Sequence, residues 1–151
     1  MKFLLKFKFL ICRECPTEIE TDPRIIDTIE GETFHVRCWE KHDKNTRYRK
    51  WVQCKWERMD DGSYCTFDYK KVVIDGENRY EVIDKCVGLD DHYFFGDEGL
   101  YKGEDNPYCG LNINPTSLKD RGNWRCSLVF EEPEDAILCI AETLVLAEVI
   151  F

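Results

Sequence analysis

Hydrophobic and polar residues alternate along several short stretches of this chain. In residues 34–38, 52–56, 109–113 and 124–130, apolar side chains occupy every second position. A period of two residues is typical of a β-strand with one buried side. No stretch keeps a helical period with capping residues for three turns. The sequence therefore predicts an all-β fold.

Turn residues separate these stretches. Gly31 precedes the first, and the segment 60–62, Asp-Asp-Gly, follows the second. Glycine accepts positive φ, so this segment predicts a hairpin whose returning strand covers residues 63–69. Asn114 and Pro115 follow the third stretch, and Pro133 ends the fourth because proline cannot donate to a central ladder.

Residues 72–107 are predicted to form a long irregular region. Only residues 72–74 and 80–83 qualify there as strand candidates. The region holds ten acidic and three basic residues, a net charge of −7. We therefore expect an expanded, solvent-exposed acidic loop region.

The apolar run 136–151 at the C-terminal end is predicted to be a buried final strand. As a helix, sixteen residues would span about 24 Å, short of the roughly 30 Å hydrocarbon core of a membrane. Glu142 and Glu148 also interrupt the run. Both observations argue against a membrane anchor.

The N-terminal segment, residues 1–21, allows two interpretations. Apolar residues alternate with Lys6 and Lys8, as in an amphipathic strand, but the segment also resembles a degenerate or truncated secretion signal. The single predicted domain covers residues 22–151, since 151 residues suffice for one core.

Composition narrows the classes of function. The formal net charge of −9 argues against nucleic acid as a partner, because phosphate contacts need Lys and Arg. Nine cysteines in so short a chain predict disulfides made in an oxidising compartment. The odd number leaves at least one thiol unpaired or paired between chains.

The segment 120–126, Asp-Arg-Gly-Asn-Trp-Arg-Cys, resembles the Asp-x-Gly-x-Tyr-x-Cys motif of immunoglobulin-superfamily domains. Trp124 occupies the tyrosine position. The resemblance covers roughly residues 22–148 and implies an immunoglobulin-like antiparallel β-sandwich. It further implies that Asp120 and Gly122 form a tight corner, which Trp124 anchors. Cys126 would then reach across the core to Cys38, which matches the strand B cysteine.

The chain departs from the family pattern on its second strand. The family's Val-x-Trp becomes Val52-x-Cys54, and Trp56 follows one repeat later. Residues 111–113 match the family's Leu-x-Ile, and Cys109 shares their inward parity. The resemblance thus implies a second bridge, Cys54–Cys109, in an arrangement similar to divergent secreted immunoglobulin-like domains of invertebrates.

Five cysteines remain after these two bridges. Cys65 and Cys86 are candidates for a third bridge that ties the acidic region to the sheet. Cys12, Cys15 and Cys139 are left, so one of them is odd. A redox or zinc role for Cys12-x-x-Cys15 lacks a second CxxC, and a disulfide or a tail is preferred.

Catalytic and metal sites are not expected. The three histidines, His35, His42 and His92, have no nucleophile in a catalytic motif beside them, and we interpret them as solvent-facing. The acidic residues of the loop region do not follow the spacing of a calcium loop. We therefore predict no cofactor, no metal and no enzyme activity.

Tyr93, Phe94 and Phe95 are candidate partner contacts, because aromatic residues ringed by charge are typical of interface centres. The alternative is that they fold back over the sandwich edge. A basic group in the first long loop could pair with the acidic region in self-association: Lys41, Lys44, Arg47, Arg49 and Lys50.

The function that the sequence favours is a secreted or cell-surface module for recognition or adhesion, which binds a protein ligand, a receptor or a second copy through its loops. A cysteine-rich secreted effector or inhibitor that blocks an enzyme or receptor is the alternative. A lectin-like module is a third hypothesis, without a sugar-and-calcium motif to support it. The fold by itself does not decide among them.

Overall fold

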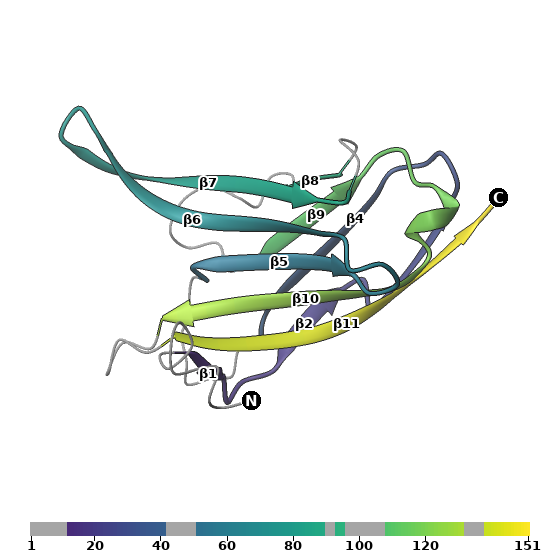
Figure 1. Cartoon of the computed structure of the whole chain (residues 1–151), viewed down its shortest axis with the longest axis horizontal. Coiled ribbons are helices and arrows are strands. Elements are labelled where there is room, and N and C mark those ends of the chain that lie inside the picture. Colours follow the sequence, from purple (N-terminus) through teal and green to yellow (C-terminus); the bar gives the residue numbers. More distant parts are fainter. Residues whose placement is uncertain (1–11, 42–50, 90–92, 96–107, 132–137) are drawn as a thin grey trace.

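The structure is a computed structural model, and it describes residues 12–41, 51–89, 93–95, 108–131 and 138–151. Two β-sheets face each other, and the single described helical turn is the 3-10 helix η2 (Leu118–Asp120). Figure 1 shows the larger sheet in front of the smaller one, with the C-terminal strand running along its lower edge.

The larger sheet has seven strands in the order β1-β11-β10-β5-β6-β7, and β3 also pairs with β11. Both β1 and β3 run parallel to β11, at opposite ends of it, while the other pairs are antiparallel. Its strands are β1 (Cys12–Glu14), β3 (Ile25–Ile29), β5 (Gln53–Arg58), β6 (Tyr64–Ile74), β7 (Glu77–Val87), β10 (Gly122–Glu131) and β11 (Leu138–Ile150).

The smaller sheet has four antiparallel strands in the order β2-β4-β9-β8. Its strands are β2 (Ile19–Asp22), β4 (Phe34–Glu40), β8 (Tyr93–Phe95) and β9 (Cys109–Ile113). Together the two sheets form the immunoglobulin-like sandwich that the resemblance implies. Two strands beyond β5, namely β6 and β7, extend the larger sheet as in the variable-type arrangement.

The core lies between the two sheets and follows the alternation of the strands. On β4, Phe34, Val36 and Cys38 are buried, while on β5 Cys54 and Trp56 are fully buried. The largest fully buried side chains come from both layers and include three tryptophans: Trp51, Trp56, Trp124, Phe67, Phe130, Leu111, Ile113 and Leu128. Burial of each such side chain contributes about 1.5–3 kcal/mol, so this layer holds the sheets together.

Four disulfides join the described strands. Cys38–Cys126 and Cys54–Cys109 cross the core, with Cα–Cα distances of 6.6 and 6.5 Å. Cys65–Cys86 joins the neighbouring strands β6 and β7. These are the three pairs expected from the sequence. The fourth pair is Cys15–Cys139, and the ninth cysteine is Cys12, whose side chain lies outside the described part of the chain.

The expectation of an irregular stretch over residues 72–107 is wrong for its first part. Strands β6 and β7 pair continuously from Tyr64–Val87 to Ile74–Glu77. Asp75 and Gly76 form the turn, both with positive φ (53° and 79°), which is the requirement of a two-residue hairpin turn that follows strand twist. The hairpin projects beyond the rest of the sandwich (Figure 1). Residues 90–92 and 96–107 lie outside the described part.

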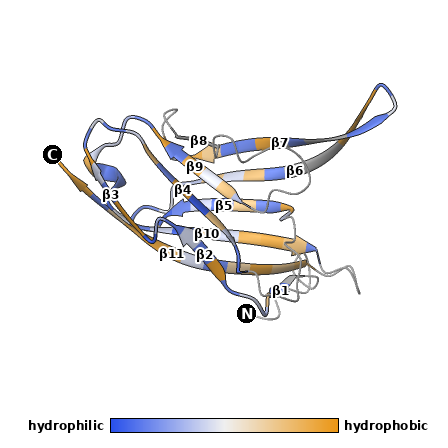
Figure 2. Cartoon of the chain, turned by 180° about the vertical axis from the view of Figure 1, so that it is seen from behind, coloured by the Kyte–Doolittle hydropathy of each residue, from blue (hydrophilic) through white to orange (hydrophobic). Residues whose placement is uncertain are grey.

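The expected C-terminal strand is present as β11, but it is buried on one side only. Val145, Ala147 and Val149 point into the core, whereas Leu144 and Ile150 are 57% and 63% exposed. The larger sheet covers the core with one face and has no layer over its other face in the described part of the chain. Figure 2 shows hydrophobic residues along β10 and β11 up to the C-terminal end.

The sandwich also includes residues that were predicted to belong to the separate N-terminal segment. Strand β1 pairs with residues 138–140 of β11, and β2 pairs with β4. The described sandwich therefore begins before residue 22. Among the described residues, no helix has the length and hydropathy needed to cross a membrane.

Removing the bridge between Cys38 and Cys126 by a double substitution to alanine is expected to lower the free energy of unfolding by about 4–5 kcal/mol. The reason is that the bridge closes a loop of 88 residues in the unfolded chain. Urea denaturation checks this. The matched control removes Cys65 and Cys86, whose loop of 21 residues predicts about 3 kcal/mol. Equal losses for the two pairs would contradict the loop-length argument.

Candidate recognition surface

The Asp-x-Gly-x-Trp corner is closed by hydrogen bonds to a buried aspartate. Asp120 is fully buried, and its carboxylate accepts from the backbone N–H of Ser117 at 2.8 Å and from Arg58 Nη1 at 3.4 Å. The indole N–H of Trp124 donates to the Asp120 carbonyl at 2.8 Å. Gly122 has φ 120°, and a Cβ there would lie 2.7 Å from an Asp60 carboxylate oxygen. The corner therefore needs a glycine, as the motif implies.

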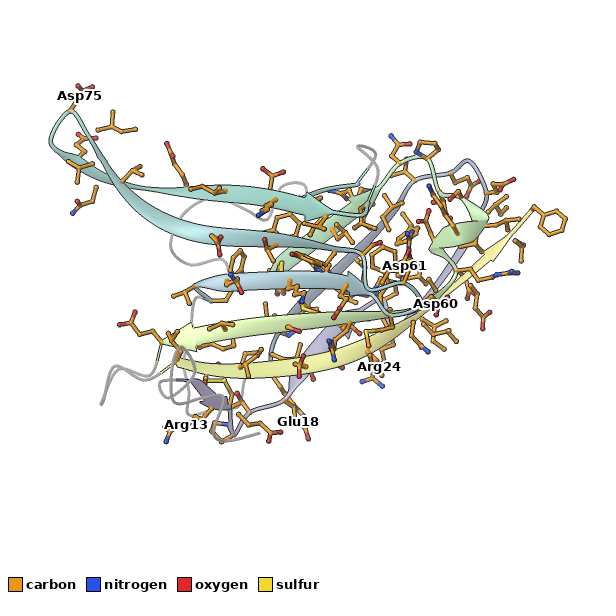
Figure 3. All side chains as sticks on the ribbon, viewed as in Figure 1. Arg13, Glu18, Arg24, Asp60, Asp61 and Asp75 are labelled. Carbon is orange, nitrogen blue, oxygen red and sulfur yellow. A yellow bond between two sulfur atoms is a disulfide. The ribbon has the colours of Figure 1, made fainter. Side chains whose placement is uncertain are left out.

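Arg58 links this corner to the β5–β6 turn. Its Nη2 donates to Asp61 at 2.6 Å, and the Asp61 carboxylate also accepts from the backbone N–H of Ser63 at 2.9 Å. The hydrogen bond from Arg58 holds the pKa of Asp61 well below its usual range, against the opposing effect of partial burial, and the Ser63 N–H adds to the lowering. Figure 3 places Asp60 and Asp61 at the end of the sandwich remote from Asp75.

Charged, polar and apolar side chains lie together on the outer face of the larger sheet, which we call the outer sheet face. Register places the outward side chains of five strands side by side. It consists of Ile140, Glu142 and Leu144 on β11; Arg125, Ser127 and Val129 on β10; Gln53, Lys55 and Glu57 on β5; Tyr64, Thr66 and Asp68 on β6; and Ile83, Lys85 and Val87 on β7.

Charged side chains of both signs form a network at its centre. Arg125 Nη2 donates to Glu57 at 2.5 Å, and Arg125 Nε lies 3.3 Å from Glu142. Ser127 donates to the same Glu142 at 2.9 Å. Lys55 Nζ lies 4.0 Å from Glu57. The network is only partly exposed, so its geometry is fixed by packing within the sheet.

Apolar side chains flank this network on both sides. Leu144 and Leu146 are 57% and 39% exposed on β11, and Ile83 and Val87 are 46% and 42% exposed on β7. Next to Leu146 on β3 lies the half-exposed Ile25. Singly scattered apolar groups need no explanation, but a stripe that continues across paired strands is typical of a contact surface.

A shallow hollow lies at the β3 end of this stripe. Its lining combines two apolar side chains, three carboxylates and a threonine: Ile29, Ile150, Asp27, Glu32, Glu148 and Thr28. Within the described residues, the group of side chains close enough to hold a metal ion is Cys38, Cys54 and Cys109. Their sulfurs are bonded in disulfides, and a metal requires the thiolate.

The smaller sheet presents a compact polar and aromatic group on its outer side. The Arg37 guanidinium lies 4.6 Å from the Tyr108 ring centre, and the Trp39 and Tyr108 rings meet edge to face at 5.1 Å. Arg37 also pairs with Asp22 at 3.3 Å. These half-buried side chains contact one another, so they present less unpartnered apolar surface than the outer sheet face does.

The structure places the residues that were singled out in the sequence at several distant positions. His35 is exposed on β4, as expected, and its Nδ1 contacts the side chain of Asn112. Lys41 is exposed and lies 3.9 Å from Glu18. Residues 93–95 form β8 beside β9, but their side chains lie outside the described part. The other members of the basic group, and residues 90–92 and 96–107 of the acidic region, lie outside the described part.

Sequence reasoning missed the exposed stripe on β11, although a signal for it exists. Glu142 and Glu148 occupy even positions and point to solvent, and Leu144, Leu146 and Ile150 share that parity. Side chains two residues apart on a strand lie on the same face. The two glutamates therefore identify the leucines between them as outward-facing.

Comparison with known proteins supports the fold alone. No family model and no curated protein matches the chain. Among solved structures, one matching chain comes from work on T cell specificity and activation by the bacterial superantigen toxic shock syndrome toxin-1 (TM-score 0.50, 9% identity, 89% of this chain and 99% of that one). Another comes from the RIG-5 IG1 homodimer (TM-score 0.50, 14% identity, 91% and 100%). The fold is thus immunoglobulin-like.

The substitution Asp61→Asn is expected to destabilise the chain at neutral pH and to do so less as the pH falls. A carboxyl with a lowered pKa stabilises the folded state above its ordinary value of 3.8, and this contribution is lost as the pH falls through the lowered pKa. Urea denaturation from about pH 6 to about pH 2 checks it. Asp60→Asn, which removes a charge at the adjacent position, is the control. A pH-independent difference between wild type and Asp61→Asn would contradict the assignment.

Proposed function

We propose that the chain is a non-catalytic recognition module of the extracellular space, and that it binds a second copy of itself through the outer sheet face. The observation that supports this most directly is the exposed apolar stripe on β11 beside a charge network of both signs. Interfaces combine such apolar contacts with complementary charges.

The pattern along one row of this face is self-complementary. Leu144, Arg125, Glu57, Tyr64 and Val87 lie side by side across five strands. A two-fold axis that runs along the strands between β10 and β5 sets Arg125 of one copy opposite Glu57 of the other. The same axis sets Leu144 opposite Tyr64. Each contact then occurs twice, as an isologous interface requires.

The neighbouring row obeys the same symmetry without a clash of charge. It reads Glu142, Ser127, Lys55, Thr66 and Lys85. The axis sets Ser127 opposite Lys55 and Glu142 opposite Thr66, so no like charges face each other in these pairs. Like charges across an interface cost several kcal/mol, and their avoidance favours this pairing over an arbitrary one.

The area of the face suits a reversible dimer. Five strands spaced about 4.8 Å apart, taken over the six residues of the shortest of them, β5, at about 3.3 Å each, give roughly 24 by 20 Å, or about 480 Å². Two such faces bury about 960 Å² in total, which is in the range of transient interfaces. The RIG-5 IG1 neighbour is a homodimer, which agrees with self-association but does not identify the face.

The four disulfides support the extracellular part of the proposal, because such a framework forms and persists in oxidising compartments. The inhibitor hypothesis differs in its partner and not in its fold. It requires an unrelated protein on the same face or on the loops, and a chain that does not self-associate.

Sedimentation velocity of the full chain over a concentration series is expected to show a reversible dimer. Leu144→Glu should weaken it by about 100-fold, because the symmetry removes two apolar contacts of about 1.5 kcal/mol each. Val73→Glu, at a 69% exposed position near the hairpin tip, is the matched control and should leave the dimer unchanged. Circular dichroism verifies that both variants fold.

A charge exchange tests the symmetry itself. Arg125→Glu and Glu57→Arg each place like charges opposite each other in a homodimer, so each variant alone should be monomeric. An equimolar mixture should restore association, since two acidic side chains of one variant then face two basic side chains of the other across the axis. A wild-type chain that stays monomeric up to about 1 mM would overturn self-recognition and leave the inhibitor hypothesis. A mixture that fails to associate would overturn this axis.

A further inference from the structure

The four disulfides differ in how far their cysteine residues are exposed to solvent. Cys38, Cys126, Cys54, Cys109 and Cys139 are fully buried, and Cys15 is 6% exposed. In the Cys65–Cys86 pair, Cys65 is fully buried but Cys86 is exposed. Among the four described bridges, this is the single pair with an exposed cysteine residue.

The position of Cys86 in the sheet also allows an external thiolate to approach from the direction that the exchange reaction requires. A thiolate attacks a disulfide sulfur from the side opposite the leaving sulfur. Cys65 lies on β6 and Cys86 directly opposite on β7. In the strand order of the described residues, β7 is the last strand. The approach to Cys86 away from Cys65 therefore leads out over the free edge of the sheet.

We infer that Cys65–Cys86 is a site of thiol–disulfide exchange with external thiols, and that it reacts selectively among the four bridges. The external thiolate forms a bond to Cys86 Sγ, and the Cys65–Cys86 bond breaks. Cys65 leaves as a thiolate and takes up a proton. A second thiol then attacks the mixed disulfide and releases Cys86 as a thiol. The two external thiols are oxidised to a disulfide, and the protein pair gains two electrons.

The exchange would loosen one strand without opening the core. Strand β7 packs mainly against β6, and among the described elements no other makes comparable contacts with it. A two-stranded ribbon without a covering layer is only marginally stable. The bridge is thus the covalent restraint on an edge strand of low local stability. The two bridges that cross the core link other strands and stay intact.

Intramolecular exchange with the ninth cysteine does not compete with this reaction. Cys12 lies on β1, at the other end of the strand order from β7. Five strand spacings of about 4.8 Å separate them by about 24 Å. The thiol that opens the bridge must therefore come from another molecule.

The test treats the folded chain, and separately its Cys12→Ser variant, with a graded series of reduced glutathione. New thiols are trapped by alkylation and mapped by mass spectrometry. Cys65 and Cys86 should be labelled together and at least about tenfold faster than the other six bridged cysteines, since buried sulfurs react only after opening. Hydrogen exchange of the same samples should rise in β6 and β7 and stay unchanged in β4, β9, β10 and β11.

The double variants Cys65→Ala with Cys86→Ala, and Cys15→Ala with Cys139→Ala, provide a matched pair. The first should reproduce the exchange pattern of the treated wild type, whereas the second should leave β7 unaltered. Labelling of Cys15 and Cys139 at the same rate would overturn the selectivity. So would resistance of Cys65 and Cys86 until the whole chain unfolds. The labelling readout does not depend on dimer formation, because Cys65 and Cys86 share the parity of the buried Trp56 and not that of the outer sheet face.

Discussion

The structure depends on two disulfides that stand side by side between its sheets. Cys38 on β4 lies opposite Cys109 on β9, and each crosses the core to a different strand of the larger sheet. The sulfurs of Cys38, Cys54 and Cys109 lie within 4.8 Å of one another. Each of the four central strands, β4, β9, β5 and β10, is thereby cross-linked to a strand of the opposite sheet. Such cross-links stabilise the fold mainly by restricting the unfolded chain.

This covalent centre explains why the sandwich can present apolar side chains outward. The core is closed by the disulfides and by Trp56, Trp124 and Phe67, so the stability of the fold does not require the outer side chains of β11 to be covered. Those side chains are held on a rigid sheet, beside a charge network whose partners are already in contact. A contact surface on such a platform loses little entropy when it binds, which is the advantage of preorganisation.

The periphery of the molecule is held together differently from its centre. Strands β6 and β7 continue past the rest of the sandwich and end at Asp75, well away from Asp61 (Figure 3). In the described part of the chain this hairpin pairs with one neighbouring strand, β5, and a disulfide joins its two strands at the base. Cys86, on the last strand of the described order, is the exposed partner of that bridge. The corner at Asp120 contrasts with this exposed edge, because its carboxylate is buried and accepts hydrogen bonds from Ser117 and Arg58.

Alternation, together with the resemblance carried by the corner motif, predicted a large part of this fold from the sequence alone. The period of two residues identified the core strands, and the resemblance to immunoglobulin-superfamily domains implied the two cysteine pairs that cross the core. The turn at Asp75 and Gly76 was missed despite its hairpin sequence, because the charge of the surrounding segment suggested a loop. Only the tertiary structure decided that β11 is covered on one face, that Arg58 reaches Asp120, and that Cys86 lies open at an edge. The physical reason is that periodicity reports which side chains share a face, whereas their burial depends on how far the opposing sheet extends and where the strand order ends.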